Sequence, residues 1–351
     1  MPKPFRFGRG GLPFRQFRQP DTDVAGIGTA PRRSTGCNTG TSAVLIPRLV
    51  FGCARLTGGF SSNEARRLVE GALRAGFRHF DTAPSYGIGT AEIVIGTVLG
   101  PHQDVAITAK VGSIRPRFAV ARTAARRALR LAGYGSKPVS VYEPAMPNSA
   151  HQPDGCFDIQ YMERSLALTL ANLRRSSVTY LLLHESYRAY SSPDLVAFLA
   201  GLIAGGIAEH VGFANSAVYD AALHGSCPAH WTAQAAIHPD MFLRPVQLAR
   251  PTILHSLLKL HLWLGSIDPA YALATEHTLD KFASLAPRDA LATLLPYYLA
   301  TRNVPEAKLI YGTSELARLN SIITSAAMID SVAGDHEIAN AFLTSYNLYK
   351  R

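Results

Sequence analysis

The chain has 351 residues, of which 47% are hydrophobic and 17% are charged, and its formal net charge is +10 at pH 7. This apolar content is enough for a sizeable core, but the sequence never reaches the ~18 consecutive apolar residues of a membrane-spanning helix. Residues 1–44 hold seven Lys or Arg against two Asp, so half of the excess charge lies there. The excess over the rest of the chain is too small to favour nucleic-acid binding.

The four cysteines are Cys37, Cys53, Cys156 and Cys227, which are far apart and form no C-x-x-C pair. No histidine stands at ligand spacing from them, so the sequence predicts neither a metal site nor a disulfide framework. This cysteine usage favours a reducing compartment, and we expect a cytoplasmic protein.

Residues 1–44 are predicted to be a basic, disordered N-terminal extension. They are rich in Gly, Arg, Pro, Ser and Thr and show no sustained apolar periodicity. An Arg-rich, acid-poor N-terminus is also typical of an organelle transit peptide. Against that alternative, Pro2, Pro4, Pro13 and Pro20 would interrupt an amphipathic helix.

From Leu45 onward, predicted strands and helices alternate. A strand over residues 48–53 precedes a helix over 62–75, and the next short strand ends at Asp81. Pro and Gly residues then break the chain before a helix over 91–99. A third buried strand over 105–110 ends on Lys110.

Residues 118–131 are predicted to form an Arg-rich helix, followed by a Pro- and Ser-rich loop. Two interpretations stand for this region: a solvated helix outside the domain, or a segment that folds over the pocket and contributes to substrate choice. Amphipathic helices are predicted over 158–173 and 195–203, and the strand between them, over 180–183, ends on His184. Successive buried strands that end on ionisable residues indicate an α/β fold of the parallel (β/α)8 TIM-barrel type.

The segment from Gly76 to Glu92 follows the pattern Gly-x-x-x-x-Asp-Thr-Ala-x-x-Tyr-Gly-x-Gly-x-x-Glu. Lys110 and His184 follow it at strand ends, and with this segment the chain resembles the aldo-keto reductase superfamily over about residues 45–344. The resemblance implies one (β/α)8 barrel over residues 45–351 and hydride transfer between NADP or NAD and an aldehyde, ketone or sugar. Asp-Thr-Ala-Pro-x-Tyr-Gly and the long third loop look most like the sugar dehydrogenase branch of galactose or fucose type.

The resemblance also implies a catalytic set, which is Asp81, Tyr86, Lys110 and His184. Tyr86 would donate a proton to the carbonyl oxygen or accept one from an alcohol. Lys110 would lower the pKa of Tyr86, while Asp81 would hold Lys110 in place and keep it charged. His184 would orient or polarise the carbonyl group.

Segments 209–215, 231–234, 252–256 and 308–314 resemble the last four strands of the family. The resemblance implies cofactor contacts from Asn215, Gln234, Ser256, Gly312, Thr313, Ser314 and Arg318. Arg318 aligns with an arginine that binds the 2′-phosphate of NADP, whereas Gly312 stands where many NADP-preferring relatives carry Lys. Both NADP and NAD therefore remain candidate cofactors.

A second function is compatible with the same residues: a non-catalytic barrel that binds nicotinamide nucleotide and regulates a protein partner. The intact catalytic set favours the enzyme. We therefore expect a small carbonyl or sugar substrate as the partner, and neither nucleic acid nor membrane, while the sequence specifies no oligomeric state.

Overall fold

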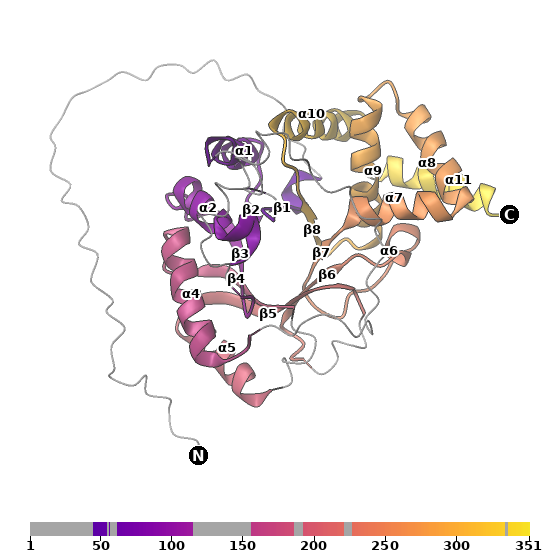
Figure 1. Cartoon of the computed structure of the whole chain (residues 1–351). Coiled ribbons are helices and arrows are strands. Elements are labelled where there is room, and N and C mark those ends of the chain that lie inside the picture. Colours follow the sequence, from indigo (N-terminus) through magenta and orange to yellow (C-terminus); the bar gives the residue numbers. More distant parts are fainter. Residues whose placement is uncertain are drawn as a thin grey trace, which may run out of the picture. The chain divides into compact units, whose positions relative to one another are not determined.

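The computed structural model describes residues 45–54, 56, 62–114, 156–185, 192–220, 227–333 and 336–351. Within them, eight parallel strands close into a barrel in chain order, with β8 pairing back to β1 (Figure 1). The strands are β1 (Leu49–Gly52), β2 (His79–Asp81), β3 (Ala106–Val111), β4 (Val178–His184), β5 (Ala208–Val218), β6 (Thr232–Ala236), β7 (Thr252–His255) and β8 (Lys308–Tyr311). This topology confirms the predicted (β/α)8 barrel. The predicted extension over 1–44 and the predicted helix over 118–131 lie outside the described residues.

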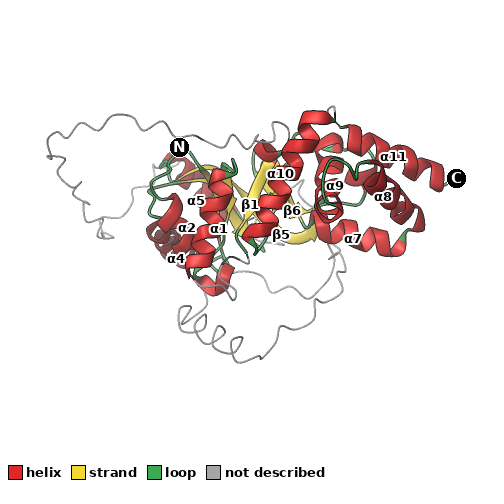
Figure 2. Cartoon of the chain, turned by 90° about the horizontal axis from the view of Figure 1, so that it is seen from above, coloured by secondary structure: helices red, strands yellow, loops and turns green. Residues whose placement is uncertain are grey.

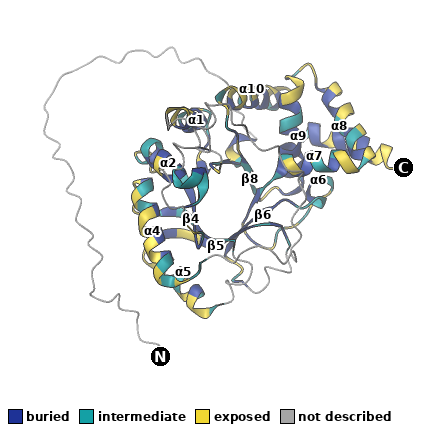
Figure 3. Ribbon diagram, viewed as in Figure 1, coloured by how far each residue is buried: buried dark blue, intermediate teal, exposed yellow. Residues whose placement is uncertain are grey.

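Helices surround the barrel, and their inward faces are buried while their outward faces are exposed (Figure 3). The helices that correspond to helices expected from the sequence are α1 (Ser62–Arg74), α2 (Ala91–Leu99), α4 (Ile159–Leu173) and α5 (Pro193–Ala204). Helix α10 (Leu316–Val332) follows β8. A single turn, α6 (Asp240–Leu243), follows β6, and a short 3-10 helix, η1 (Ile46–Arg48), precedes β1. Among the described residues, no helix combines the length and the hydropathy that crossing a membrane requires.

The local sequence explains the boundaries of α4. The Asp158 side chain caps its start by accepting a hydrogen bond from the Tyr161 backbone N–H, which would otherwise lack a partner. Met162 and Leu166 recur at helical spacing and are buried against the barrel. The helix ends at Arg174, whose left-handed φ of 56° stops the helical hydrogen-bond pattern.

Side chains along each strand alternate between the barrel interior and the layer of helices. The helix-facing rows supply the main hydrophobic core, in which the Phe51 ring lies 5.4 Å from Phe77 and 5.7 Å from Phe80. The interior rows are more polar. At the N-terminal end of the barrel, the ring of His79 stacks on Tyr180 at 5.1 Å, and Tyr180 stacks on His210 at 4.8 Å.

Two arginines at the N-terminal end bind backbone carbonyl groups where neighbouring helices end. Arg48 donates to the carbonyl oxygens of Thr301, Val304 and Ala307 at 2.8–3.2 Å. Arg175 donates in the same way to the carbonyl oxygens of Leu99, His102 and Val105. The six carbonyl groups lie in the last turns of α9 and α2 and in the loops that lead from these helices to β8 and β3.

Glu92, the last residue of the sequence pattern, belongs to the packing of α2 on α4. Its buried carboxylate accepts hydrogen bonds from Thr169 at 2.8 Å and Asn172 at 3.1 Å. One turn later, a Cβ atom at Gly96 would lie 2.0 Å from the Asn172 carbonyl oxygen. The two helices therefore touch backbone to backbone, and only glycine fits at position 96.

The residues that follow β3 contact those that precede α4. The Cys156 N–H donates to the Gly112 carbonyl oxygen at 2.6 Å. Gly112 has φ +92°, and a Cβ atom there would lie 2.4 Å from the Phe157 ring. Gly112, Cys156 and Phe157 thus form a joint between the end of β3 and the start of α4.

Four helices have no counterpart in the sequence analysis: α7 (Leu257–Ile267), α8 (Pro269–Lys281), α9 (Arg288–Asn303) and α11 (Glu337–Tyr349). They gather on one side of the barrel in both views (Figures 1 and 2). Tyr271 of α8 is fully buried among them, with its ring 4.9 Å from Phe342 and its hydroxyl 2.8 Å from His261 Nδ1. The insertion between β7 and β8 and the C-terminal helix thus share one aromatic core.

Candidate active site

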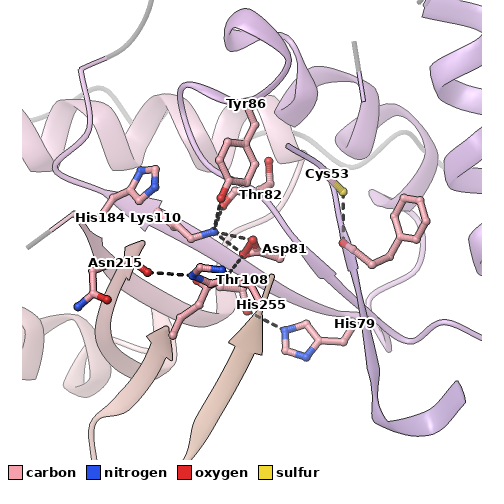
Figure 4. Close-up of polar contacts among 12 residues, drawn as sticks. Cys53, His79, Asp81, Thr82, Tyr86, Thr108, Lys110, His184, Asn215 and His255 are labelled. Carbon is pink, nitrogen blue, oxygen red and sulfur yellow. Dashed lines mark hydrogen bonds and ion pairs between the residues drawn. The ribbon is translucent and has the colours of Figure 1, made fainter. Parts of the chain in front are cut away.

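Lys110 is the centre of a polar cluster at the C-terminal end of the barrel. Its side chain is 1% exposed, and Nζ donates to Asp81 Oδ1 at 2.6 Å while also contacting Asp81 Oδ2. The same Nζ lies 3.2 Å from the Thr82 carbonyl oxygen and 3.2 Å from Tyr86 Oη (Figure 4). The structure therefore brings together three of the four residues in the predicted catalytic set.

The loop after β2 directs Tyr86 toward Lys110. The strand ends at Asp81, and in the loop that follows the Tyr86 N–H donates to the Ala83 carbonyl oxygen at 3.0 Å, which closes a tight turn. The 3-10 turn η2 (Tyr86–Gly89) then takes φ +57° at Gly87, a conformation that glycine adopts at little cost. As a result, Lys110 Nζ lies 4.7 Å from the centroid of the Tyr86 ring.

His184, at the end of β4, completes the set. Its ring lies edge-on to Tyr86, with 6.0 Å between the ring centroids. Burial, reinforced by the Lys110 cation, lowers the pKa of His184 to about 3, so the imidazole is neutral at physiological pH. Its Nδ1 atom is buried and has no hydrogen-bond partner among the described residues.

The expected effect of Lys110 on Tyr86 is corrected by the structure. Burial, followed by the negative charge of Asp81, raises the pKa of Tyr86 well above its usual value. Burial also lowers the pKa of Lys110, although Asp81 opposes this shift. Because the charges of Asp81 and Lys110 largely cancel, desolvation of the phenolate dominates and keeps Tyr86 protonated.

Gln234 reaches this cluster from the opposite side of the barrel. Its Nε2 atom donates to Asp81 Oδ2 at 3.0 Å, a hydrogen bond that crosses the interior from β6 to β2. Its Oε1 atom is buried and has no partner among the described residues, and the same is true of Asn215 Oδ1. These two amide oxygens fit the NH2 group of a nicotinamide carboxamide, which needs hydrogen-bond acceptors.

His255, at the end of β7, belongs to the site but was not among the predicted site residues. Its Nε2 atom lies 2.9 Å from the Asn215 carbonyl oxygen, and its Nδ1 atom lies 2.9 Å from Ser256 Oγ. A carbonyl oxygen only accepts, so Nε2 carries the proton and Nδ1 accepts from Ser256. The signal in the sequence was present, because β7 ends on an ionisable residue as β2 and β4 do.

The remaining predicted cofactor residues lie after β8. A Cβ atom at Gly312 would be 3.2 Å from the Gly52 carbonyl oxygen, so this glycine permits a close approach of β8 to β1. Thr313 accepts the Glu315 N–H at 3.2 Å, and Ser314 follows it directly. Helix α10 then begins without a side-chain cap. Uncapped N–H groups at the positive end of a 17-residue helix fit a cofactor phosphate.

Arg318 lies in the first turn of α10. It is exposed, and its guanidinium lies 3.7 Å from the Glu315 carboxylate. Within the described residues, no group of three or more His, Cys, Asp and Glu side chains could hold a metal ion.

The aldo/keto reductase family model matches residues 48–230, slightly more than half of the chain. D-threo-aldose 1-dehydrogenase from Pseudomonas sp is 34% identical over 86 residues, which cover 23% of this chain and 26% of that enzyme. The match thus spans about a quarter of that relative's length.

Two solved structures share the fold. The holo form of an aldo-keto reductase from Bacillus halodurans has a TM-score of 0.56 and 14% identity, over 87% of this chain and 94% of the other. Glycerol dehydrogenase from Gluconobacter oxydans has a TM-score of 0.52 and 15% identity, over 79% and 86% of the two chains. With the family match and the barrel in agreement, the chain belongs to the aldo/keto reductase family.

Proposed function

We propose that the protein is an oxidoreductase that transfers a hydride between NAD or NADP and the carbonyl carbon of an aldehyde, ketone or sugar, with Tyr86 as the acid/base residue. The contact of Tyr86 Oη with Lys110 Nζ, itself paired with Asp81, is the observation that supports it most directly. The similarity to an aldose dehydrogenase favours a sugar among these substrates.

The raised pKa of Tyr86 keeps its hydroxyl protonated at neutral pH, so in the direction of reduction it has a proton to donate. The Lys110 ammonium, 3.2 Å away, stabilises the negative charge that develops on the phenolic oxygen as that proton leaves. Asp81 keeps Lys110 charged and in place. His184 is neutral and holds the substrate oxygen next to Tyr86.

The nicotinamide, when bound, supplies or accepts the hydride, which no protein side chain can do. Asn215 and Gln234 would hold its carboxamide through their unpartnered amide oxygens, and His255 fixes the backbone at Asn215. Gly312, Thr313 and Ser314, with the N-terminus of α10, would hold the phosphates.

Tyr86→Phe tests the assignment, because it removes the hydroxyl and keeps the ring. Turnover of aldehydes and aldoses should fall at least ~10²-fold, while the affinity for NAD and NADP, titrated by protein fluorescence, should change little. Tyr297→Phe is the matched control, since that hydroxyl donates to the Ile310 carbonyl oxygen outside the cluster. Native turnover in Tyr86→Phe would contradict the role of Tyr86.

The same assay separates the enzyme from a nucleotide-binding regulatory barrel. A wild-type protein that binds the cofactor yet turns over none of a panel of aldoses, aromatic aldehydes and ketones would favour the regulatory function. The intact contact among Asp81, Lys110 and Tyr86 supports the enzyme.

A further inference from the structure

The side chain of Gln234 crosses the barrel interior at the level of the candidate active site. β6 lies opposite β2 in the closed barrel, and Gln234 Nε2 reaches Asp81 Oδ2 at 3.0 Å. The neighbours in register are small, since Ala214 stands beside Gln234 on β5 and Gly52 stands beside Asp81 on β1. Gln234 is 2% exposed and Asp81 is 1% exposed, so bulk water does not compete for this hydrogen bond.

The chemistry of Asp81 fixes which way the Gln234 amide faces. The Asp81 carboxylate, which forms an ion pair with Lys110, only accepts hydrogen bonds. If the amide were turned by 180°, its oxygen would face Asp81 Oδ2, and two acceptors would lie 3.0 Å apart in a buried site. Nε2 therefore faces Asp81, and Oε1 is left without a partner among the described residues.

This anchor determines what Gln234 offers to a ligand. An unanchored amide can present either its oxygen or its NH2 group, whereas the anchored one presents only an acceptor. Donation to an anion also polarises the amide and makes Oε1 a stronger acceptor. Asn215 Oδ1 is likewise buried and without a partner among the described residues, so it adds a second acceptor. Two such oxygens accept from an NH2 group and repel an anionic oxygen.

We propose that Asp81 is a positioning residue for Gln234, in addition to its contact with Lys110, and that it thereby makes the cofactor site selective for a carboxamide over a carboxylate. A nicotinamide carboxamide carries an NH2 group with two donors. The nicotinic-acid form of the same nucleotide carries there a carboxylate oxygen, which only accepts. The site then binds NAD or NADP and rejects their nicotinic-acid analogues. This inference rests on the proposed function, which supplies the nicotinamide cofactor.

The test compares dissociation constants, titrated by protein fluorescence, for NAD, NADP and their nicotinic-acid analogues. The two members of each pair differ only in this group, so a general loss of pocket shape cancels in the ratio of their dissociation constants. The wild type should bind the nicotinamide form at least ~10-fold more tightly than the nicotinic-acid form. Gln234→Met keeps the size of the side chain but loses both polar atoms, and it should reduce this ratio at least ~5-fold.

Asp81→Asn tests the positioning role, because it keeps the shape of Asp81 but allows the Gln234 amide to turn. The ratio should fall at least ~3-fold, although residue 81 is not expected to touch the cofactor. Adding Asp81→Asn to Gln234→Met should change the ratio by less than ~2-fold, since Asp81 acts through Gln234. Tyr86→Phe is the matched control: it removes a different contact of Lys110 and should keep the wild-type ratio within ~2-fold.

Asp81→Asn leaves the Lys110 charge unpaired, so the same ratio is also measured in the double variant with Lys110→Met, where the expected fall is the same. Equal wild-type affinities for the two members of a pair would overturn the inference. A wild-type ratio in the folded Asp81→Asn variants, or a fall in Tyr86→Phe as large as that in Gln234→Met, would do so as well. If an unselective wild type still turns over carbonyl compounds, the inference fails while the proposed function stands. A protein that binds neither NAD nor NADP refutes both.

Discussion

The two ends of the barrel use the same strands for different purposes. β2 carries His79 at its N-terminal end and Asp81 at its C-terminal end, and β4 carries Tyr180 in its N-terminal half and His184 at its C-terminal end. At the N-terminal end the rings stack on each other, and two arginines bind six backbone carbonyl groups. At the C-terminal end, buried polar atoms of Asn215, Gln234 and His184 have no partner among the described residues.

This difference indicates that residues at the N-terminal end of the barrel mainly stabilise the fold, whereas residues at the C-terminal end mainly serve the reaction. At the N-terminal end the stacked rings and the arginine–carbonyl hydrogen bonds hold the fold together, although His79 Nδ1 and Arg175 Nε also lack a partner among the described residues. At the C-terminal end the unpartnered atoms lie around the cluster of Asp81, Lys110 and Tyr86, where a ligand can use them. Substitutions at the N-terminal end should therefore change stability alone, and those at the C-terminal end should change activity.

The largest effect is expected from Lys110→Met. Turnover should fall ~10³-fold, because the cation that stabilises the Tyr86 phenolate is lost. The variant also leaves Asp81 as an unpaired buried charge, which should cost about 3–5 kcal/mol of unfolding free energy. The double variant with Asp81→Asn should regain most of the stability, measured by denaturant unfolding, but none of the activity. Recovery of turnover in the double variant would contradict the role of Lys110.

At the other end, Arg175→Met should lower the unfolding free energy by about 2 kcal/mol, because three carbonyl groups lose a charged donor. At a temperature where the variant stays folded, kcat and KM should remain within ~2-fold of the wild type. The adjacent, exposed Arg174→Met is the matched control, and its stability should change by less than ~0.5 kcal/mol. A loss of activity without a loss of stability in Arg175→Met would contradict the conclusion that the N-terminal end of the barrel affects stability alone.

Acid should destabilise the protein through both ends. Burial lowers the pKa of His79 and of His184 to about 3 each, below the ordinary value of 6.5. The unfolded chain then binds protons that the folded chain does not, so stability is full above pH ~6.5 and falls as the pH drops toward 3. His79→Phe should reduce the loss in unfolding free energy between pH 7 and pH 5 by about 2 kcal/mol and leave turnover unchanged.

His184→Phe should weaken the same pH dependence of stability and, in contrast, reduce turnover. Urea unfolding at several pH values, combined with initial rates, distinguishes the two variants. An unchanged pH dependence in both would mean that neither histidine is buried in its neutral form.

The smallest effect concerns the choice of cofactor. If Arg318 lies beside the adenosine ribose, Arg318→Ala should weaken NADP binding about tenfold and leave NAD within ~2-fold, since only NADP carries a 2′-phosphate. Glu315, 3.7 Å from Arg318, competes for the guanidinium, so Glu315→Gln should strengthen NADP binding a few-fold, as expected for an exposed charge. Equal changes for both cofactors in fluorescence titrations would remove Arg318 from the ribose site.

The sequence was informative where the functional residues lie close to one another along the chain. The segment from Gly76 to Glu92 carries both Asp81 and Tyr86, and the strand that ends on Lys110 was predicted within one residue. The barrel follows from alternating strands and helices, each with its own apolar pattern.

Features that depend on distant residues could not be predicted in this way. The Gln234–Asp81 hydrogen bond joins strands on opposite sides of the barrel, 153 residues apart in the chain. The raised pKa of Tyr86 depends on the burial of its ring and on the nearby Asp81 carboxylate, which no local pattern reports. Helices α7, α8, α9 and α11 were missed for a related reason, since they pack mainly on one another around Tyr271.

The joint at Gly112, Cys156 and Phe157 has a consequence for the diversification of this scaffold. Its two ends meet through one hydrogen bond, while α2 and α4 pack directly against each other beside it. A segment grafted between such adjacent points need not span any distance, and doubling its length costs only about 0.6 kcal/mol in closure entropy. At this position, recombination can therefore replace the segment between β3 and α4 with another one while the barrel itself stays unchanged.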